Sequence, residues 1–486
     1  MRRALLLGTA TVVLALAAPA LADVTICDRV LRVSEKDIAY NGGLEPTVER
    51  AYRSDSGHTG VFGPGWGSRY DTRLQPQADG TVKISEYGCG PEVVFRTSAD
   101  GSKLIGYHCG HQELTRDGDT WRRSYENGKA DTFDGRGYLV RSADGNNNWI
   151  DIRRRADGGI VSVLDNFGRR LEFLYDDKGR LSRVVGDDGR QFSYEFDAGG
   201  RLARAIGDDG KAEAYGYDAG GHLTTITHAD GSTETVAYDP AAPTVVTRYV
   251  DRSGTSHGYE VVEASNYREI RETTTDSDGS VLSRSRRSLF YHDGDSGHPW
   301  RELSDRDGYL RDTEYNQLGL PAIIRGGDGG VATFRYTAEA RLARKVTNDA
   351  SISLSYDRAT GKVTRVEHRT PGAAATWSEY RYDSRGNLIA ATSSDGHRVG
   401  LSYDTYGRVA KFMEGTRRMR FSYDRDSHPV VMEVAGSGKI TVTYDRHGEI
   451  ADVKSDGGRK IALTITRMFQ DLLDIARAAK VNLDLS

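Results

Sequence analysis

A turn-forming motif recurs along the chain at intervals of about 21 residues, a spacing typical of repeat proteins. Each copy has an aromatic residue followed by Asp or a similar residue, then Gly four positions after the aromatic and an aliphatic residue two positions later. The clearest copy runs from Tyr175 to Leu181, with Gly179 in its turn. Such an internal repeat indicates a chain that uses one supersecondary unit many times.

Several copies keep both the aromatic residue and the glycine. They include Tyr175 with Gly179, Phe196 with Gly200, Tyr217 with Gly221, Tyr382 with Gly386, Tyr403 with Gly407, and Tyr444 with Gly448. We interpret these residues as structural, with the aromatics forming a ladder and the Asp and Gly residues forming turns. Position 154, one period before Tyr175, keeps the turn but has Arg in place of the aromatic.

Each period also contains a second turn. A glycine lies seven residues before most of the aromatics, as Gly168 does before Tyr175, and apolar and polar residues alternate between the turns, as over 170–175. Alternation with a period of two indicates strands. One unit therefore predicts two strands and two turns, and the whole predicts an all-β fold made of a continuous antiparallel meander.

The predicted sheet is too wide to remain flat. About 30 strands at about 4.8 Å each would span roughly 140 Å, and sheets of this width twist and curl. A spiral or a shell is the expected outcome. We divide the chain into a signal peptide (1–22), an N-terminal β region (23–130), the repeat shell (131–465) and a C-terminal helix with a short tail (466–486).

The N-terminus has the pattern of a secretory signal. Arg2 and Arg3 precede an apolar stretch, and Ala20-Leu21-Ala22 forms a cleavage site, so the mature chain is expected to begin at Asp23. This predicts a periplasmic, cell-surface or secreted protein. No later segment approaches the roughly 20 apolar residues of a membrane helix, so no membrane span is expected after signal removal.

Charge argues against a nucleic-acid partner. The formal net charge is −4, and no long basic block interrupts the sequence. Proteins that bind nucleic acid without a basic patch are uncommon.

The chain has three cysteines, Cys27, Cys89 and Cys109. Cys89 and Cys109 have similar neighbours, and export favours a disulfide between them. Equivalent positions of successive hairpins lie roughly 9 to 10 Å apart, which exceeds the span of a disulfide, so the bridge requires irregular local structure or Cys27 as a partner. His108 and His111 add zinc-type ligands beside the cysteines, but their spacing is not that of a common zinc site, and no metal or cofactor is expected.

Two N-terminal segments resemble a known family. Residues 48–54 read VERAYRS and residues 61–68 read VFGPGWGS; together with the repeats they are similar to the bacterial Rhs and YD-repeat proteins, whose repeats also occur in animal teneurins. The resemblance implies a hollow β-shell wound as a spiral. It also implies that the shell carries or encloses a variable C-terminal domain, in some members a toxin, and carbohydrate binding has been proposed for the repeats.

The C-terminal part departs from the large toxin carriers. The chain is short and has neither their core boundary motif nor a separate toxin domain after Ile465. Residues 466–480 predict one helix with Met468, Leu472, Ile475 and Ala479 along its apolar face. We expect this helix to cap the last strand edge, with docking to a partner as the alternative.

The repeat loses its rhythm between Tyr238 and Tyr315, whose separation is not a whole number of periods. A predicted loop at 293–300 and a smaller insertion at 369–377 interrupt the meander, and loops on rigid scaffolds often carry binding residues. Trp300, His298 and Trp377 are therefore the candidate binding residues. The tryptophans could stack on sugar rings or pack against the sheet.

The HExxH motif of zinc metalloproteases does not occur in the sequence. We therefore expect a non-enzymatic scaffold or binding shell for a protein or carbohydrate partner in the cell envelope. The alternatives are a carrier or remnant of a polymorphic-toxin system, and a carbohydrate hydrolase, which would need two carboxylates about 5 to 10 Å apart.

Overall fold

The computed structural model describes residues 21–25, 29–40, 44–98, 101–107, 111–292, 299–358, 360–445 and 448–456. Within these residues the regular structure is β-strand, apart from one turn of 3-10 helix, η1 (Arg69–Asp71). The predicted all-β fold is confirmed. Residues 1–20 of the predicted signal peptide and the predicted helix at 466–480 lie outside the described residues.

A small sheet forms at the N-terminus. Its strands pair in the order β1-β2-β3-β6, and β4 and β5 form a separate short hairpin beside it. The bounds are β1 (Leu21–Thr25), β2 (Val30–Ala39), β3 (Thr47–Arg53), β4 (Thr59–Gly60), β5 (Gly63–Pro64) and β6 (Trp66–Gly67).

The main sheet contains 36 strands, β7 to β42, each paired with its neighbours in chain order. In its first half these are β7 (Arg73–Pro76), β8 (Val82–Ser85), β9 (Glu92–Thr97), β10 (Leu104–Tyr107), β11 (His111–Asp117), β12 (Thr120–Tyr125), β13 (Ala130–Phe133), β14 (Leu139–Ala143), β15 (Trp149–Arg154), β16 (Ile160–Asp165), β17 (Arg170–Tyr175), β18 (Leu181–Gly186), β19 (Gln191–Phe196), β20 (Leu202–Gly207), β21 (Ala212–Tyr217), β22 (Leu223–Thr227), β23 (Thr233–Asp239) and β24 (Ala242–Val250).

The second half continues the same meander. Its strands are β25 (Ser256–Ala264), β26 (Tyr267–Thr275), β27 (Val281–Phe290), β28 (Arg301–Arg306), β29 (Tyr309–Tyr315), β30 (Pro321–Gly326), β31 (Val331–Tyr336), β32 (Leu342–Thr347), β33 (Ser351–Tyr356), β34 (Val363–Arg369), β35 (Thr376–Tyr382), β36 (Leu388–Ser393), β37 (Arg398–Tyr403), β38 (Val409–Glu414), β39 (Arg417–Tyr423), β40 (Pro429–Val434), β41 (Gly438–Tyr444) and β42 (Ile450–Ser455).

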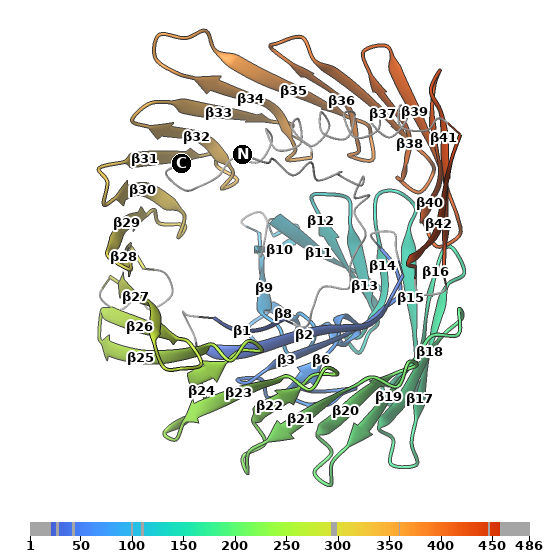
Figure 1. The fold of residues 1–486 in the computed structure, drawn as a ribbon, viewed down its shortest axis with the longest axis vertical. Coiled ribbons are helices and arrows are strands. Elements are labelled where there is room, and N and C mark those ends of the chain that lie inside the picture. Colours follow the sequence, from blue (N-terminus) through green and yellow to red (C-terminus); the bar gives the residue numbers. More distant parts are fainter. Residues whose placement is uncertain are drawn as a thin grey trace, which may run out of the picture.

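The main sheet curls into a ring (Figure 1). Its last strands, β38 to β42, return to the neighbourhood of β14 to β18, and the N-terminal sheet lies against β19 to β24 on the side turned toward the middle of the ring. Among the described strands β42 pairs with β41 alone, and no hydrogen-bonded ladder joins it to β7. The ring is therefore an open spiral and not a closed barrel.

The repeat motif has a specific geometry in each hairpin. The Tyr175 hydroxyl donates a hydrogen bond of 2.8 Å to the carbonyl oxygen of Ile160, fifteen residues earlier. The Asp176 side chain accepts from the amides of Lys178 and Arg180, and Gly179 closes the turn at a φ of 76°. The tyrosine thus connects its own hairpin to the one before it.

The same hydroxyl-to-carbonyl bond recurs along the ladder. It is made by Tyr217, Tyr238, Tyr336, Tyr356, Tyr382, Tyr403, Tyr423 and Tyr444. A cation supplies the next contact: the Arg180 guanidinium pairs with Asp176 and lies 5.4 Å from the ring of Phe196, the aromatic of the following repeat. The ladder therefore alternates aromatic rings with basic side chains.

The loss of rhythm after Tyr238 corresponds to longer strands. β25 and β26 have nine residues and β27 has ten, where most strands of the regular repeats have six. Of the predicted loop at 293–300, residues 293–298 lie outside the described residues.

Candidate functional site

One face of the main sheet is turned toward the N-terminal sheet. Residues directly opposite one another in an antiparallel ladder share a face, so the register of each pair carries this assignment from strand to strand. Phe173, Tyr194 and Tyr215 contact Tyr70, Phe62 and Trp66 of the N-terminal segment, by which we mean the described residues from 21 to 73. We call the face that carries these three residues, continued along the ladder, the inner face.

The inner face changes character twice along the sheet. From β16 to β25 it is mainly apolar and forms one buried cluster with the N-terminal segment. Over β26 to β29 it carries charged residues, among them Glu272, Arg287 and Glu302, with Arg287 Nε 2.6 Å from Glu302 Oε1. From β30 to β41 it is apolar again, and the described members of its two buried clusters come from these strands alone.

A buried chain of polar groups attaches the N-terminal segment to the inner face. Arg50 on β3 is 1% exposed; its guanidinium lies 2.7 Å from Asp37 and 3.3 Å from Glu213, and donates to the Tyr215 hydroxyl. The Tyr194 hydroxyl donates to Asp37 at 2.6 Å. Burial opposes the charge, but Asp37 keeps the pKa of Arg50 above its ordinary value.

The chain of contacts continues along the sheet from Glu213. His228 has Nδ1 3.2 Å from Glu213 and Nε2 2.8 Å from Glu234, and the Tyr249 hydroxyl donates to Glu234 at 2.6 Å. This network was not predicted from the sequence. Its one visible signal was that Arg50 stands inside the VERAYRS segment.

Glu35 is a buried acid of this region whose charged form is disfavoured. Burial, and then the carboxylate of Glu213, raise the pKa of Glu35 to about 8, against an opposing effect of Arg50. When folding raises the pKa of an acid, protonation of that acid favours the folded state over the unfolded state. Its contribution is complete below the unfolded pKa of about 4.5 and is lost as the pH rises through about 8.

We therefore expect the free energy of unfolding to fall between pH 4.5 and pH 8, and Glu35→Gln to remove at least about 2 kcal/mol of that fall, because the amide does not ionise. Urea denaturation of both proteins across this range measures the difference. Glu92→Gln, on the exposed Lys83–Glu92 ion pair, is the control and should leave the slope unchanged. Parallel curves for wild type and Glu35→Gln would contradict the assignment.

Turns far apart in sequence meet where the ring returns on itself. We call this contact the seam; it joins the turns at 144–148, 165–169 and 186–190 to those at 383–387, 404–408 and 424–428. Asn146 and Asn387 exchange side-chain hydrogen bonds of 3.1 and 2.7 Å, Asn148 donates to the Tyr406 carbonyl at 2.9 Å, and the rings of Phe167 and Tyr406 lie 4.5 Å apart.

The two sides of the seam use different turns of the repeat. The early side presents the turns that lie before each aromatic, and the late side presents the Asp-x-x-Gly turns that follow it. These two kinds of turn lie at opposite ends of the strands. The last strands are therefore displaced along the strand direction relative to the early ones, as in a spiral.

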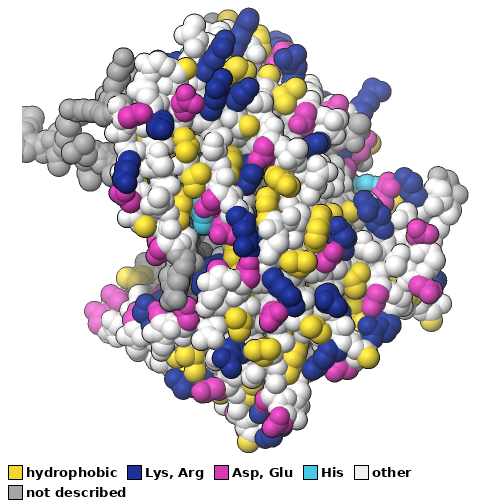
Figure 2. Space-filling view, turned by 90° about the vertical axis from the view of Figure 1, so that its right-hand side faces the viewer, with side chains coloured by type: hydrophobic (Ala, Val, Ile, Leu, Met, Phe, Trp, Pro, Cys, Tyr) yellow, Lys and Arg dark blue, Asp and Glu magenta, His cyan; other side chains and the backbone are white. Residues whose placement is uncertain are grey.

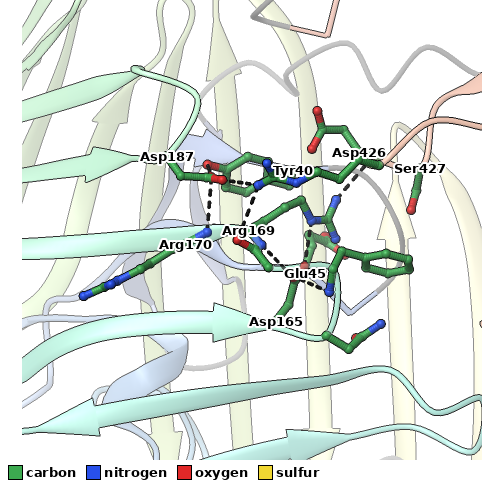
Figure 3. Close-up of polar contacts among 12 residues, drawn as sticks. Tyr40, Glu45, Asp165, Arg169, Arg170, Asp187, Asp426 and Ser427 are labelled. Carbon is green, nitrogen blue, oxygen red and sulfur yellow. Dashed lines mark hydrogen bonds and ion pairs between the residues drawn. The ribbon is translucent and has the colours of Figure 1, made fainter.

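Three parts of the chain converge at one end of the seam (Figure 3). Asp187 accepts from the Tyr40 hydroxyl at 2.7 Å and forms an ion pair with Arg425. Arg169 is fully buried; it lies 2.6 Å from Asp165 and donates to the Asp426 carbonyl at 3.3 Å. The N-terminal segment, the early hairpins and the late hairpins are thus joined at one polar cluster.

We expect Asn387→Ala to loosen the seam. The change removes both hydrogen bonds to Asn146, which at about 1 kcal/mol each should speed amide exchange in the 144–148 turn by about fivefold or more. Hydrogen exchange resolved by mass spectrometry reads this out. His222→Ala is the matched control, because His222 has the same place in its repeat and pairs with Asp218 away from the seam; equal exchange at 144–148 in both variants would disprove the seam contact.

The predicted binding residues lie on separate elements. Trp300, just before β28, is 37% exposed and stacks with His292 at a centroid distance of 5.9 Å. Trp377 on β35 is half-buried beneath the Arg365 guanidinium at 4.9 Å. His298 lies outside the described residues, so a joint role for the three stays a prediction.

Cys89 carries a free, buried thiol. Its sulfur donates to the Ala51 carbonyl at 3.3 Å, and burial raises its pKa to about 12, which makes it a poor nucleophile. Cys27 and Cys109 lie outside the described residues, so the predicted disulfide stays a prediction. Within the described part of the chain no cluster of three or more His, Cys, Asp or Glu side chains is placed to hold a metal ion.

The outer surface mixes charges of both signs. On the side that carries β15 to β18 and β38 to β42, Lys and Arg side chains are interspersed with Asp and Glu, and neither sign forms a continuous field (Figure 2). No helix among the described residues has the length and apolar character needed to cross a bilayer.

Two family models match the sequence. One, described as a domain of unknown function (DUF6531), covers residues 30–95, which include most of the N-terminal segment and β7 to β9. The other, the teneurin YD-shell, covers residues 134–259. No curated protein matches the chain.

The chain is also similar to several solved structures. The Photorhabdus luminescens Tc holotoxin pore is 15% identical, with 89% of this chain and 26% of that chain covered and a TM-score of 0.42. The crystal structure of TcdB2-TccC3 is 14% identical, with 89% of this chain and 27% of that chain covered and a TM-score of 0.43. The crystal structure of TcdB2-TccC3-Cdc42 is 14% identical, with 88% of this chain and 27% of that chain covered and a TM-score of 0.43. This chain spans about a quarter of the length of those proteins.

The repeat and the family match agree in position. The YD-shell match falls on strands β14 to β25, and the same tyrosine-to-carbonyl bond continues beyond it as far as Tyr444 on β41. This agreement supports an Rhs and YD-repeat fold for the repeat region of the chain.

Proposed function

We propose that this protein is an exported YD-repeat shell that binds a polypeptide partner against the inner face of β30 to β41 and has no catalytic activity of its own. The observation that carries the proposal is the second apolar zone of the inner face. Val366, Ala391 and Met419 are buried within the chain itself, whereas Ile352, Leu354 and Phe421 on the same face remain partly exposed. A partner that covers these apolar side chains would remove them from water.

The chemistry of this zone favours a polypeptide over a sugar. Its side chains are aliphatic, aromatic or sulfur-containing with few polar groups, for example Leu401, Phe412 and Met432. Methionine-bearing apolar surfaces adapt to different peptide side chains, whereas sugars need several polar groups that fix their orientation.

Photo-crosslinking from the cell envelope tests the proposal. A photoreactive residue at Ser378 would project from the inner face, because Ser378 is directly opposite Val366 in the β34–β35 ladder. The same residue at Glu379, the next position, would project from the outer face and is the matched control. We expect a defined protein adduct from position 378 and not from 379; an adduct formed only with residues 457–486 of the same chain would contradict a separate partner.

Export is tested separately. Fractionation followed by N-terminal sequencing should recover a mature chain that begins at Asp23 in the envelope or the medium. An unprocessed chain that remains in the cytoplasm would contradict this part of the proposal.

Carbohydrate binding is the second candidate, and the exposure of Trp300 favours it. Trp300 is 37% exposed, and exposed indole rings stack on sugars. Trp300→Ala should abolish retention on a glycan array if this candidate holds. A toxin-carrier role is the third, and a neighbouring gene for a small toxin or an immunity protein would support it.

A further inference from the structure

The repeat is interrupted at the position where an aromatic residue is replaced by arginine. Arg154 stands one period after Phe133 and one period before Tyr175. Its Nε donates at 3.1 Å to the carbonyl of Leu139, fifteen residues earlier, which is the acceptor that a ladder tyrosine would use. The arginine therefore preserves the structural bond of the repeat and adds a positive charge.

This charge is not neutralised within the described residues. The other hydrogen bonds of Arg154 also go to backbone carbonyls, those of Gly158 at 2.9 Å and of Tyr70. Its guanidinium lies 5.1 Å from the centre of the Tyr138 ring, and no described carboxylate forms an ion pair with it. A guanidinium has five N–H donors, of which three are used. Burial is the main cause that lowers the pKa of Arg154, as expected for a cation that lacks a close counter-ion.

A cavity of about 580 Å³ opens beside Arg154. The N-terminal segment supplies His58, Asp71 and Arg73 to its wall, and the repeat hairpins supply Arg154, Arg155 and Tyr175. This volume is within the range of small-molecule sites. The cavity thus lies between the two parts of the molecule.

The two carboxylates that line the cavity are already engaged, and Asp157 lies 3.1 Å from Arg155. Asp71 accepts from the Ser68 amide at 2.9 Å and from its hydroxyl at 3.0 Å, and burial raises its pKa despite the nearby positive charge of His58 and Arg154. Arg73 lies 3.9 Å from the centre of the Tyr138 ring and forms no described ion pair. Positive charge therefore dominates this wall of the cavity.

We propose that this cavity binds a small ligand bearing a carboxylate, sulfate or phosphate group, with the two free Arg154 N–H donors and the Arg73 guanidinium as its counter-ions. Paired N–H donors of a guanidinium match two oxygens of such a group. The proposal is independent of partner binding on the inner face of β30 to β41, so either can fail without the other.

Titration of the purified full chain with sulfate, phosphate and glucuronate tests the proposal, with glucose and sodium chloride of equal ionic strength as blanks. Calorimetry and the thermal unfolding midpoint are the readouts. We expect saturable binding of at least one oxyanion, and the preferred one identifies the class as carboxylate, sulfate or phosphate. A response no larger than that to sodium chloride would overturn the site.

The decisive variant is Arg154→Tyr, which restores the aromatic of the repeat. Its hydroxyl can take the Leu139 carbonyl, so we expect an unfolding midpoint equal to or above that of wild type and an affinity for the oxyanion at least tenfold weaker. Arg136→Gln is the matched control, because Arg136 also lies near the Tyr138 ring, at 5.1 Å, but does not line the cavity. Unchanged affinity in Arg154→Tyr would overturn the proposal.

A second variant tests the site without changing residue 154. Asp71→Asn removes one competing carboxylate of the cavity wall and should tighten oxyanion binding about threefold or more. Binding that is equal or weaker would contradict the role given to the uncompensated charge.

Discussion

Replacing Arg50 with alanine is expected to lower the free energy of unfolding by about 3 to 5 kcal/mol, because it leaves buried carboxylates without their cation. Asp37 has a side chain only 2% exposed and is 2.7 Å from the guanidinium. Glu213, 3.3 Å away, loses the same partner. Urea denaturation followed by tryptophan fluorescence measures the loss, since Trp66 lies 5.8 Å from the Arg50 guanidinium.

Two comparisons isolate the cause. Lys83→Ala breaks an ion pair whose side chains are 37% and 51% exposed, and surface pairs of this kind contribute less than about 1 kcal/mol. Arg50→Ala combined with Asp37→Asn and Glu213→Gln should recover part of the loss, because the buried charges are then removed together. A loss for Arg50→Ala alone that is no larger than the loss for Lys83→Ala would mean that the N-terminal segment is held mainly by its apolar contacts.

The regular part of the fold was predictable because each repeat determines its structure locally. The alternation over 170–175 predicts the strand found as β17, and Gly179 predicts the turn that follows it. The loss of rhythm between Tyr238 and Tyr315 was also visible, and it corresponds to the longer strands β25 to β27. Periodicity and turn chemistry act over a few residues, so a single sequence contains them.

The seam was not predictable because its contacts depend on the accumulated curl of the sheet. Asn146 and Asn387 are 241 residues apart, and each has the composition of an ordinary turn. A small change of twist per strand, summed over the many strands between them, would bring different turns together. For the same reason the role of Arg50 could not be predicted, because its acidic partner Glu213 lies 163 residues away in the sequence.

For the candidate site, the sequence predicted only that functional residues should lie where the repeat is irregular. The tryptophans chosen on that basis, Trp300 and Trp377, stay untested. The substitution of the ladder aromatic by Arg154 was visible as a lost aromatic. Its importance became clear only when the structure placed it beside Asp71 and Arg73 of the N-terminal segment, which no repeat pattern could indicate.

Tyr175→Ser is expected to destabilise the protein by about 2 to 4 kcal/mol, as other truncations of packed aromatics do. The tyrosine contributes through two separable contacts. Its ring packs on the buried cluster and lies 4.1 Å from the Arg155 guanidinium, and its hydroxyl donates at 2.8 Å to the Ile160 carbonyl. Tyr175→Phe keeps the ring and should cost only about 1 kcal/mol for the hydrogen bond.

Tyr309→Ser is the matched control for this pair, because Tyr309 is 50% exposed at the start of β29 and should change stability by less than about 0.5 kcal/mol. Chemical denaturation of the three variants gives the comparison directly. If Tyr175→Phe costs as much as Tyr175→Ser, the hydroxyl and not the ring holds successive hairpins together. A cost for Tyr175→Ser as small as that of the exposed control would mean that strand pairing alone maintains the ladder, and the recurring aromatic would then require another explanation.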